Sequence, residues 1–291
     1  MLIYYILHYL YLYIFYSHLR LPKYNYKNIS NIYTINQSKK VIIFLSGSFY
    51  LNNSIYINKT IHDLNNEYAN IMNNYKIIIF EKVDKASIIV YEDLVNYIID
   101  LHNEINIEEL ILIGFSFGGI VASHTMNKLN NYKFTKKVII YDTPWNMINN
   151  MKKIQTNKFY RFDYISFHYI YSTYCNHYNY NEIEHILKSY NRFSNGDAAI
   201  ELIKKVHKMT DDEVNYYTSI NINLNSDVSV VNIYCTSDPI VDYQLNFDYI
   251  NSNKKNFKFR LINIEKDRIG HCTDMCYDTK YLSDLINAIQ I

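Results

Sequence analysis

The sequence is poor in the residues that interrupt regular structure, with six glycines and three prolines among 291 residues. This scarcity excludes a collagen-like chain, and a hydrophobic content of 49% excludes an intrinsically disordered one. A chain of this length can bury one large core or two small ones. We expect one domain with insertions.

Cysteine is also scarce, and its spacing excludes two further classes. The four cysteines are Cys175, Cys235, Cys272 and Cys276. They form no CxxC pair and no dense disulfide pattern, so we expect free thiols. His271 lies beside Cys272 and Cys276, but one histidine with a C-x₃-C spacing matches no zinc pattern. The sequence therefore predicts no metal site.

No excess of one charge is present. Lysine and arginine number 29 against 28 acidic residues, which gives a formal net charge of +1 without any long charged block. A protein that binds nucleic acid needs a basic surface to contact phosphates. We therefore expect no nucleic-acid partner.

Tyrosine, in contrast, is abundant at 32 residues, and asparagine, isoleucine and lysine recur throughout. This bias indicates a genome rich in A/T codons, as in some large DNA viruses or parasites. It also weakens the glycosylation pattern Asn-x-Ser/Thr at positions 28, 36, 52 and 58, because such composition produces it by chance.

Residues 1–22 form a hydrophobic N-terminal segment, of which residues 1–21 are almost wholly apolar or aromatic. A helix of that length can just cross a bilayer, although its tyrosines suit an interface better. The basic residues Arg20, Lys23 and Lys27 lie on its C-terminal side, opposite to a cleavable signal peptide. Two readings stay open: a membrane anchor that leaves the body of the protein cytoplasmic, or a segment that packs on the protein or is disordered.

From Lys39 the chain alternates short apolar runs with longer helical patterns. The runs are KKVIIFLSG, YKIIIFEKV, EELILIGFS, KKVIIYDTP, VSVVNIYCTSD and FKFRLINIEK. Each is nearly continuous and β-branched, as expected of strands buried on both faces. Helical stripes lie between them, at Ile61–Ile71 behind Thr60, at Leu94–Ile105 and at Leu282–Ile289. The pattern predicts an α/β fold, a mostly parallel sheet with helices on both faces.

One long block interrupts this alternation. Between Trp145 and about Asn225 no buried strand is evident, but helical patterns such as EIEHILKSY recur among aromatic segments. We interpret it as a helical cap inserted between two core strands. The predicted division is residues 1–22, core 23–144, cap 145–225 and core 226–291.

A candidate nucleophile lies where the third run meets a helical pattern, in ILIGFSFGG. A serine on a sharp strand-to-helix turn needs small neighbours two positions away on either side, here Gly114 and Gly118. Five of the six glycines fall near the ends of predicted strands or beside a histidine: Gly47, Gly114, Gly118, Gly119 and Gly270. This pattern favours Ser116 as a nucleophile over an ordinary turn serine. It lacks the G-x-G-x-x-G and P-loop signatures of a nucleotide site.

The chain from about Ile32 onward resembles the α/β-hydrolase fold family. ILIGFSFGG matches the family's nucleophile turn, which implies Ser116 as nucleophile. CTSDPIVD matches its acid motif and implies Asp238, although Cys235 and Asp242 replace the family's glycine and proline. RIGHCTDM implies His271 as the base. The order of these three residues is the family's order.

The resemblance also implies where an oxyanion hole would lie. One backbone N–H donor would be that of Phe117, directly after the nucleophile. The other should come from the loop after VIIFLSGS, where the family often has His-Gly and this chain has Ser46-Gly47. By position this donor is Ser48, or else Phe49.

The residues leave two questions open, namely which aspartate is the acid and which reaction the protein catalyses. Asp142 in YDTP, or Asp242, could serve as the acid in place of Asp238. The function expected is a serine hydrolase of esterase or lipase type, acting without a cofactor on a small-molecule acyl ester or lipid. The alternatives are an acyl thioesterase with the same triad and a catalytically inactive binding or scaffold protein of this fold.

Overall fold

The computed structural model describes residues 23–26, 29–45, 62–81, 91–150, 208–221, 227–236, 241–253, 258–264 and 279–291, with residues 201, 204 and 238. Four sequence predictions lie outside these residues. They concern the segment 1–22, the loop with Ser48 and Phe49, most of the predicted cap, and the loop with His271. Among the described residues, no helix is long and apolar enough to cross a membrane.

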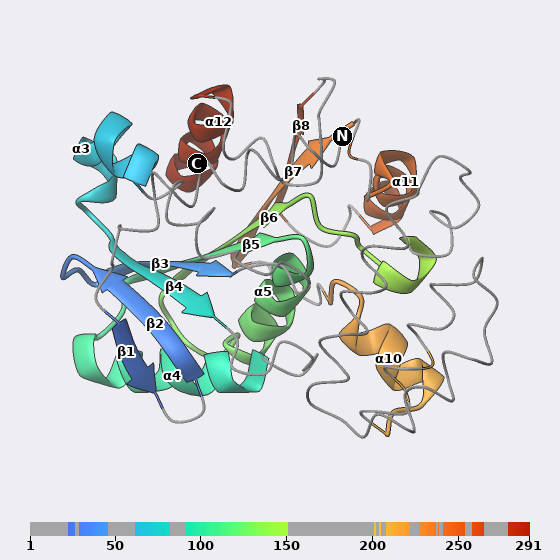
Figure 1. The fold of residues 1–291 in the computed structure, drawn as a ribbon, viewed down its shortest axis with the longest axis horizontal. Coiled ribbons are helices and arrows are strands. Elements are labelled where there is room, and N and C mark those ends of the chain that lie inside the picture. Colours follow the sequence, from blue (N-terminus) through green and yellow to red (C-terminus); the bar gives the residue numbers. More distant parts are fainter. Residues whose placement is uncertain are drawn as a thin grey trace, which may run out of the picture.

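The described strands form one sheet in the order β1-β2-β4-β3-β5-β6-β7-β8 (Figure 1). Their bounds are β1 Lys23–Tyr26, β2 Ile29–Ile35, β3 Lys40–Leu45, β4 Lys76–Glu81, β5 Glu109–Phe115, β6 Thr135–Tyr141, β7 Val228–Cys235 and β8 Lys258–Ile264. The helices are α3 Ala69–Met72, α4 Tyr91–Ile105, α5 Phe117–Lys128, α10 Asp211–Tyr217, α11 Tyr243–Asn253 and α12 Thr279–Gln290.

The six apolar runs of the sequence are the strands β3 to β8. These six strands pair in parallel with one another, which confirms the predicted α/β class with a mostly parallel sheet. The sequence analysis missed β1 and β2, which add an antiparallel edge beside β4. These two strands lack the continuous apolar pattern from which the others were recognised.

The runs are apolar throughout because helices cover both faces of the sheet. Val41 and Ile43 of β3 face a core that α4 and α5 complete. Ile42 and Phe44 face the opposite core, which α3 and α12 complete (Figure 1). A strand buried on both sides has no solvent-facing positions for polar residues.

The predicted helical stripes are confirmed in α4 and α12, where Leu94, Ile98, Leu101, Leu285 and Ile289 are buried. The predicted stripe at 61–71 needs a correction. Residues 62–67 are helical, but the backbone of Tyr68 leaves the helical region at φ −130° and ψ 34°. The helix then resumes as the short α3.

Two buried lysines at the start of β6 attach a helix to each face of the sheet. Lys136 Nζ donates to the carbonyls of Asn130 and Tyr132, just past the end of α5. Lys137 Nζ donates to the carbonyl of Ile289 in the last turn of α12. Cations are favourable at helix C-termini, where carbonyls lack partners within the helix. Burial lowers the pKa of both ammonium groups.

The two ends of the predicted cap pair with each other. Met147 donates its N–H to the carbonyl of Thr218 at 2.9 Å, and Ile220 donates to that of Trp145 at 2.8 Å. Between them, α10 begins with a capping box in which Thr210 and Glu213 exchange hydrogen bonds. The sequence analysis overlooked this short helix, although Thr210-x-x-Glu213 is a signal for a helix start. The four-part division of the chain stays a prediction.

Candidate active site

Ser116 lies at the corner between β5 and α5, at the carboxyl edge of the parallel strands. Its backbone has φ 51° and ψ −125°, outside the regions that non-glycine residues normally occupy. Such a conformation costs about 1–3 kcal/mol and persists only where surrounding contacts enforce it. Strain of this kind at a strand-to-helix turn is typical of a serine presented for reaction.

The neighbouring glycines are sterically required. A Cβ on Gly114 would lie 2.4 Å from backbone atoms of Gly118 and Gly119, so no side chain fits between β5 and the first turn of α5. A Cβ on Gly119 would lie 2.2 Å from the hydroxyl oxygen of Thr143. The turn is therefore too tight for alanine at either position.

Hydrogen bonds from the end of β6 hold the strained residue. The N–H of Ser116 donates to the carbonyl of Tyr141 at 2.9 Å. Its carbonyl accepts from the N–H of Gly119 at 3.1 Å and from Thr143 Oγ1 at 2.6 Å. Both polar backbone groups of Ser116 are therefore fixed.

The three aspartates considered as the acid differ in their environments. Asp238 follows β7 at the same edge of the sheet as Ser116, with β6 between them; it is half-buried, and Oδ1 accepts from the N–H of Val241 at 2.8 Å. Asp242 Oδ1 accepts from the N–H of Leu245 at 2.7 Å, which makes it the cap of α11. Asp142 is fully buried, and Oδ1 accepts from the N–H of Cys235 at 2.8 Å. Asp142 thus has a buried structural role, whereas Asp238 and Asp242 are both half-buried and each accept the N–H three residues further on.

Of the other predicted site residues, only Phe117 is described. It is the first residue of α5, a helix of 12 residues whose N-terminal end carries a partial positive charge. His271, Ser48 and Phe49 lie outside the described residues. No group of three or more potential metal ligands occurs among the residues the structure describes.

The sequence analysis missed two residues beside the turn. Thr143 contacts the carbonyl of Ser116, and Tyr234 of β7 donates its hydroxyl to the carbonyl of Thr143 at 3.2 Å. Tyr234 is buried, and that burial raises the pKa of its phenol well above the usual value. No sequence motif marks either residue, because their contacts join segments about 27 and 91 residues apart.

His124 of α5 contacts α10 and the residues after it. Its Nε2 lies 3.1 Å from the carbonyl oxygens of both Tyr216 and Ser219, and its ring stacks on that of Tyr91 in α4. Tyr217 also packs against it, and Lys128 is the nearby cation. Burial lowers the pKa of His124, with a smaller effect of Lys128 in the same direction; the two carbonyls act in the opposite direction.

We expect this histidine to make the protein less stable in acid. Because the pKa of His124 is lower in the folded chain, the unfolded chain takes up the proton first as the pH falls below about 6.5. The variant His124→Gln keeps an N–H donor for the carbonyls but does not titrate. Its melting temperature should fall less between pH 7 and pH 5 than that of the parent. Equal slopes in the two proteins would contradict this assignment.

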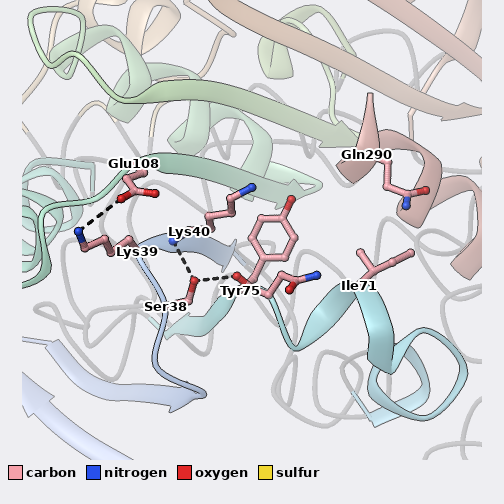
Figure 2. A pocket seen from close by; sticks show the side chains of 8 residues that line it. Ser38, Lys39, Lys40, Ile71, Tyr75, Glu108 and Gln290 are labelled. Carbon is pink, nitrogen blue, oxygen red and sulfur yellow. Dashed lines mark hydrogen bonds and ion pairs between the residues drawn. The ribbon is translucent and has the colours of Figure 1, made fainter.

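A polar pocket of about 560 Å³ lies where the strands β3 and β5 begin, at the end of the strands opposite to Ser116 (Figure 2). Its lining residues are Ser38, Lys39, Lys40, Ile71, Asn74, Tyr75, Glu108 and Gln290. Ion pairs lie along it, Lys39 with Glu108 at 3.4 Å and Lys40 with Glu109 at 3.5 Å. Lys40 and Glu109 begin β3 and β5, whereas Ser116 follows the end of β5. The pocket is therefore separate from the site at Ser116.

Comparison with known proteins gives a structural likeness without a sequence match. No protein-family model and no curated protein matches the sequence. A Staphylococcus aureus protein provisionally described as an esterase superimposes with a TM-score of 0.57 at 12% identity, over 94% of this chain and 83% of that chain. An esterase of Pyrococcus furiosus gives a TM-score of 0.51 at 14% identity, over 92% of this chain and 88% of that chain.

These identities are low enough that the likeness concerns the fold alone. It spans nearly the whole chain. The sheet of this chain has its parallel strands in the order β4, β3, β5, β6, β7 and β8. This chain has the α/β-hydrolase fold.

Proposed function

We propose that this protein is a serine hydrolase that cleaves carboxylic esters by acyl transfer. The observation that carries the proposal is the backbone of Ser116, held at φ 51° and ψ −125° on the turn between β5 and α5. The enclosing glycines and the bonds from Tyr141 and Thr143 maintain this costly conformation. An unreactive turn serine has no need of it. The esterase of Pyrococcus furiosus and the Staphylococcus aureus protein provisionally described as an esterase share this fold, which supports the same class of reaction.

The proposed chemistry follows from the weak nucleophilicity of a hydroxyl at neutral pH. His271 takes the proton of Ser116 Oγ as the oxygen attacks the ester carbonyl, and Asp238 fixes the orientation and tautomer of the imidazole. His271 then protonates the departing alcohol, which leaves an acyl-enzyme. Water, deprotonated by His271, attacks the acyl carbonyl. The bond from the acyl carbon to Ser116 Oγ then breaks, His271 returns the proton to that oxygen, and the acid is released.

The negative charge of the tetrahedral intermediate needs preset donors. We assign these to the N–H of Phe117, at the start of α5, and to the N–H of Ser48. The partial positive charge at the helix start favours an anion at that point. Losing one such donor typically costs about 10²–10³ in kcat.

Asp238 is preferred as the acid because CTSDPIVD matches the family's acid motif and because it follows β7 at the same edge of the sheet as Ser116. One of its oxygens accepts a backbone N–H and the side chain is half-buried, and both statements hold for Asp242 as well. Asp242 caps α11, and Asp142 binds the end of β7 from a fully buried position. An acyl thioesterase would use the same residues, so the leaving group has to be determined with substrates.

The proposal is tested by labelling the full-length protein with a fluorophosphonate, which reacts covalently with activated serines. We expect one label, mapped to Ser116 by mass spectrometry of the digested protein. A matched control is Ser123→Ala, because Ser123 lies on the same helix and its hydroxyl donates within the core to the carbonyl of Ile120. That variant should label like the parent. A folded parent that stays unlabelled would sink the hydrolase proposal and favour a binding or scaffold role.

A further inference from the structure

The strained turn needs restraint from outside itself. Residues within α5 supply one bond to Ser116, from the N–H of Gly119 to its carbonyl. That bond belongs to the first turn of the helix. It would form for any direction of the preceding strand, so it does not fix how Ser116 lies relative to the sheet. The conformation of Ser116 relative to the sheet therefore depends on its contacts with β6.

Those contacts come from Tyr141 and Thr143, and they bind the N–H and the carbonyl of Ser116. The carbonyl of Tyr141, the last residue of β6, accepts the N–H of Ser116 at 2.9 Å. Two residues later, Thr143 Oγ1 lies 2.6 Å from the Ser116 carbonyl and 3.2 Å from that of Tyr141. A hydroxyl has one proton, and the shorter distance indicates that it is donated mainly to Ser116.

The position of Thr143 explains why Gly119, the second glycine after Ser116, carries no side chain. The space that a Cβ on Gly119 would need is filled by Thr143, whose Oγ1 would lie at 2.2 Å and whose Cγ2 would lie at 2.9 Å. Thr143 itself is fully buried and is held from β7, because Tyr234 donates its hydroxyl to the Thr143 carbonyl. A rigid residue is thus packed against the turn, with its hydroxyl directed at the serine carbonyl.

We propose that Thr143 is a positioning residue, whose hydroxyl holds the Ser116 carbonyl and so fixes the side chain of Ser116 in its reactive orientation. The proposal rests on the proposed hydrolase function. Thr143 does not touch substrate in this account, and it acts only through the backbone of Ser116. Valine is the informative replacement, since it has nearly the same shape but puts a methyl group where the hydroxyl lies. A methyl carbon cannot approach a carbonyl oxygen to 2.6 Å, so the serine must move.

The test compares Thr143→Val with Thr143→Ser in the full-length protein. Thr143→Val should react with the fluorophosphonate about tenfold more slowly than the parent, through loss of the hydrogen bond and displacement of the nucleophile. Thr143→Ser keeps the hydroxyl and should react within about twofold of the parent rate. Against an ester substrate, the valine variant should lose kcat with little change in KM. Its pH profile should keep the parent's midpoint, because no titrating group has changed.

A matched control is Thr125→Val in α5. Thr125 is also fully buried, and within the described part of the chain its hydroxyl has no hydrogen-bond partner. This variant should react at the parent rate. A valine at position 143 that reacts as fast as the parent would overturn the proposal. So would equal losses in the serine and valine variants, because the serine variant keeps the hydroxyl and its loss could not come from a missing hydrogen bond.

Amide hydrogen exchange of residues 111–122 separates this proposal from the hydrolase proposal. If Thr143 holds the turn, exchange there should be faster in Thr143→Val than in Thr143→Ser or the parent, whether or not the protein reacts with the probe. An unreactive parent with this exchange pattern would refute the hydrolase function while retaining Thr143 as the restraint on the turn. Unchanged exchange in the valine variant would refute the restraint itself.

Discussion

Replacing Ser116 with alanine is expected to lower kcat for the best ester substrate by about 10⁶-fold, the scale seen when a catalytic serine is removed from a triad. The alanine has no oxygen to form the acyl-enzyme, so only binding and oxyanion stabilisation remain. The measurement is hydrolysis of a series of p-nitrophenyl esters and acyl thioesters of graded chain length. That series also decides between the esterase and thioesterase alternatives.

Two controls make this result specific to Ser116. The melting temperature of Ser116→Ala should not be lower than that of the parent, because the side chain is only half-buried and the structural bonds of Ser116 come from its backbone. Ser123→Ala should retain parent activity. Residual hydrolysis within tenfold of the parent in Ser116→Ala would refute the acyl-transfer proposal.

Asp238→Asn is expected to lower kcat by about 10⁴-fold, as found when the triad aspartate is replaced elsewhere. The amide oxygen can still accept the N–H of Val241, so the loop should keep its conformation. The amide cannot stabilise an imidazolium, however, and it favours the wrong tautomer of the histidine. The measurement is the pH dependence of kcat/KM for the parent and the variant, with the melting temperature as a check on folding.

The other two aspartates serve as controls for this prediction. Asp242→Asn should keep parent activity, because asparagine is an equally good helix cap for α11. Asp142→Asn can still accept the N–H of Cys235 through its amide oxygen, and we expect a loss well below that of Asp238→Asn. A larger loss of kcat in Asp142→Asn than in Asp238→Asn would assign the role of the acid to Asp142, which follows β6.

The parallel strands were predictable because each is buried on both faces. This burial imposes continuous apolar runs, and such runs can be recognised without knowing how the strands pair. The antiparallel strands β1 and β2 lack continuous apolar runs, so the hydrophobic pattern does not predict them. The break at Tyr68 was missed for a related reason, because the apolar stripe continues across it and the change in backbone direction leaves no mark in the hydrophobic pattern.

The serine turn was predictable because its requirements are local. Gly114, Ser116 and Gly118 lie within five residues, and the close approach of Gly114 to the backbone of Gly118 and Gly119 follows from one tight corner. Choosing among the three aspartates was not a local question. The bonds of Asp142 and Asp242 to Cys235 and Leu245, and the complete burial of Asp142, became evident only from the structure.

By itself, the sequence determined the α/β class, the position of each buried strand along the chain and the place of the candidate nucleophile, because hydrophobic periodicity and glycine spacing act over a few residues. Only the tertiary structure decided how the strained serine is held. Thr143 and Tyr234 act through contacts between β5, β6 and β7, and pairing between strands distant in the chain depends on the whole fold rather than on any short pattern.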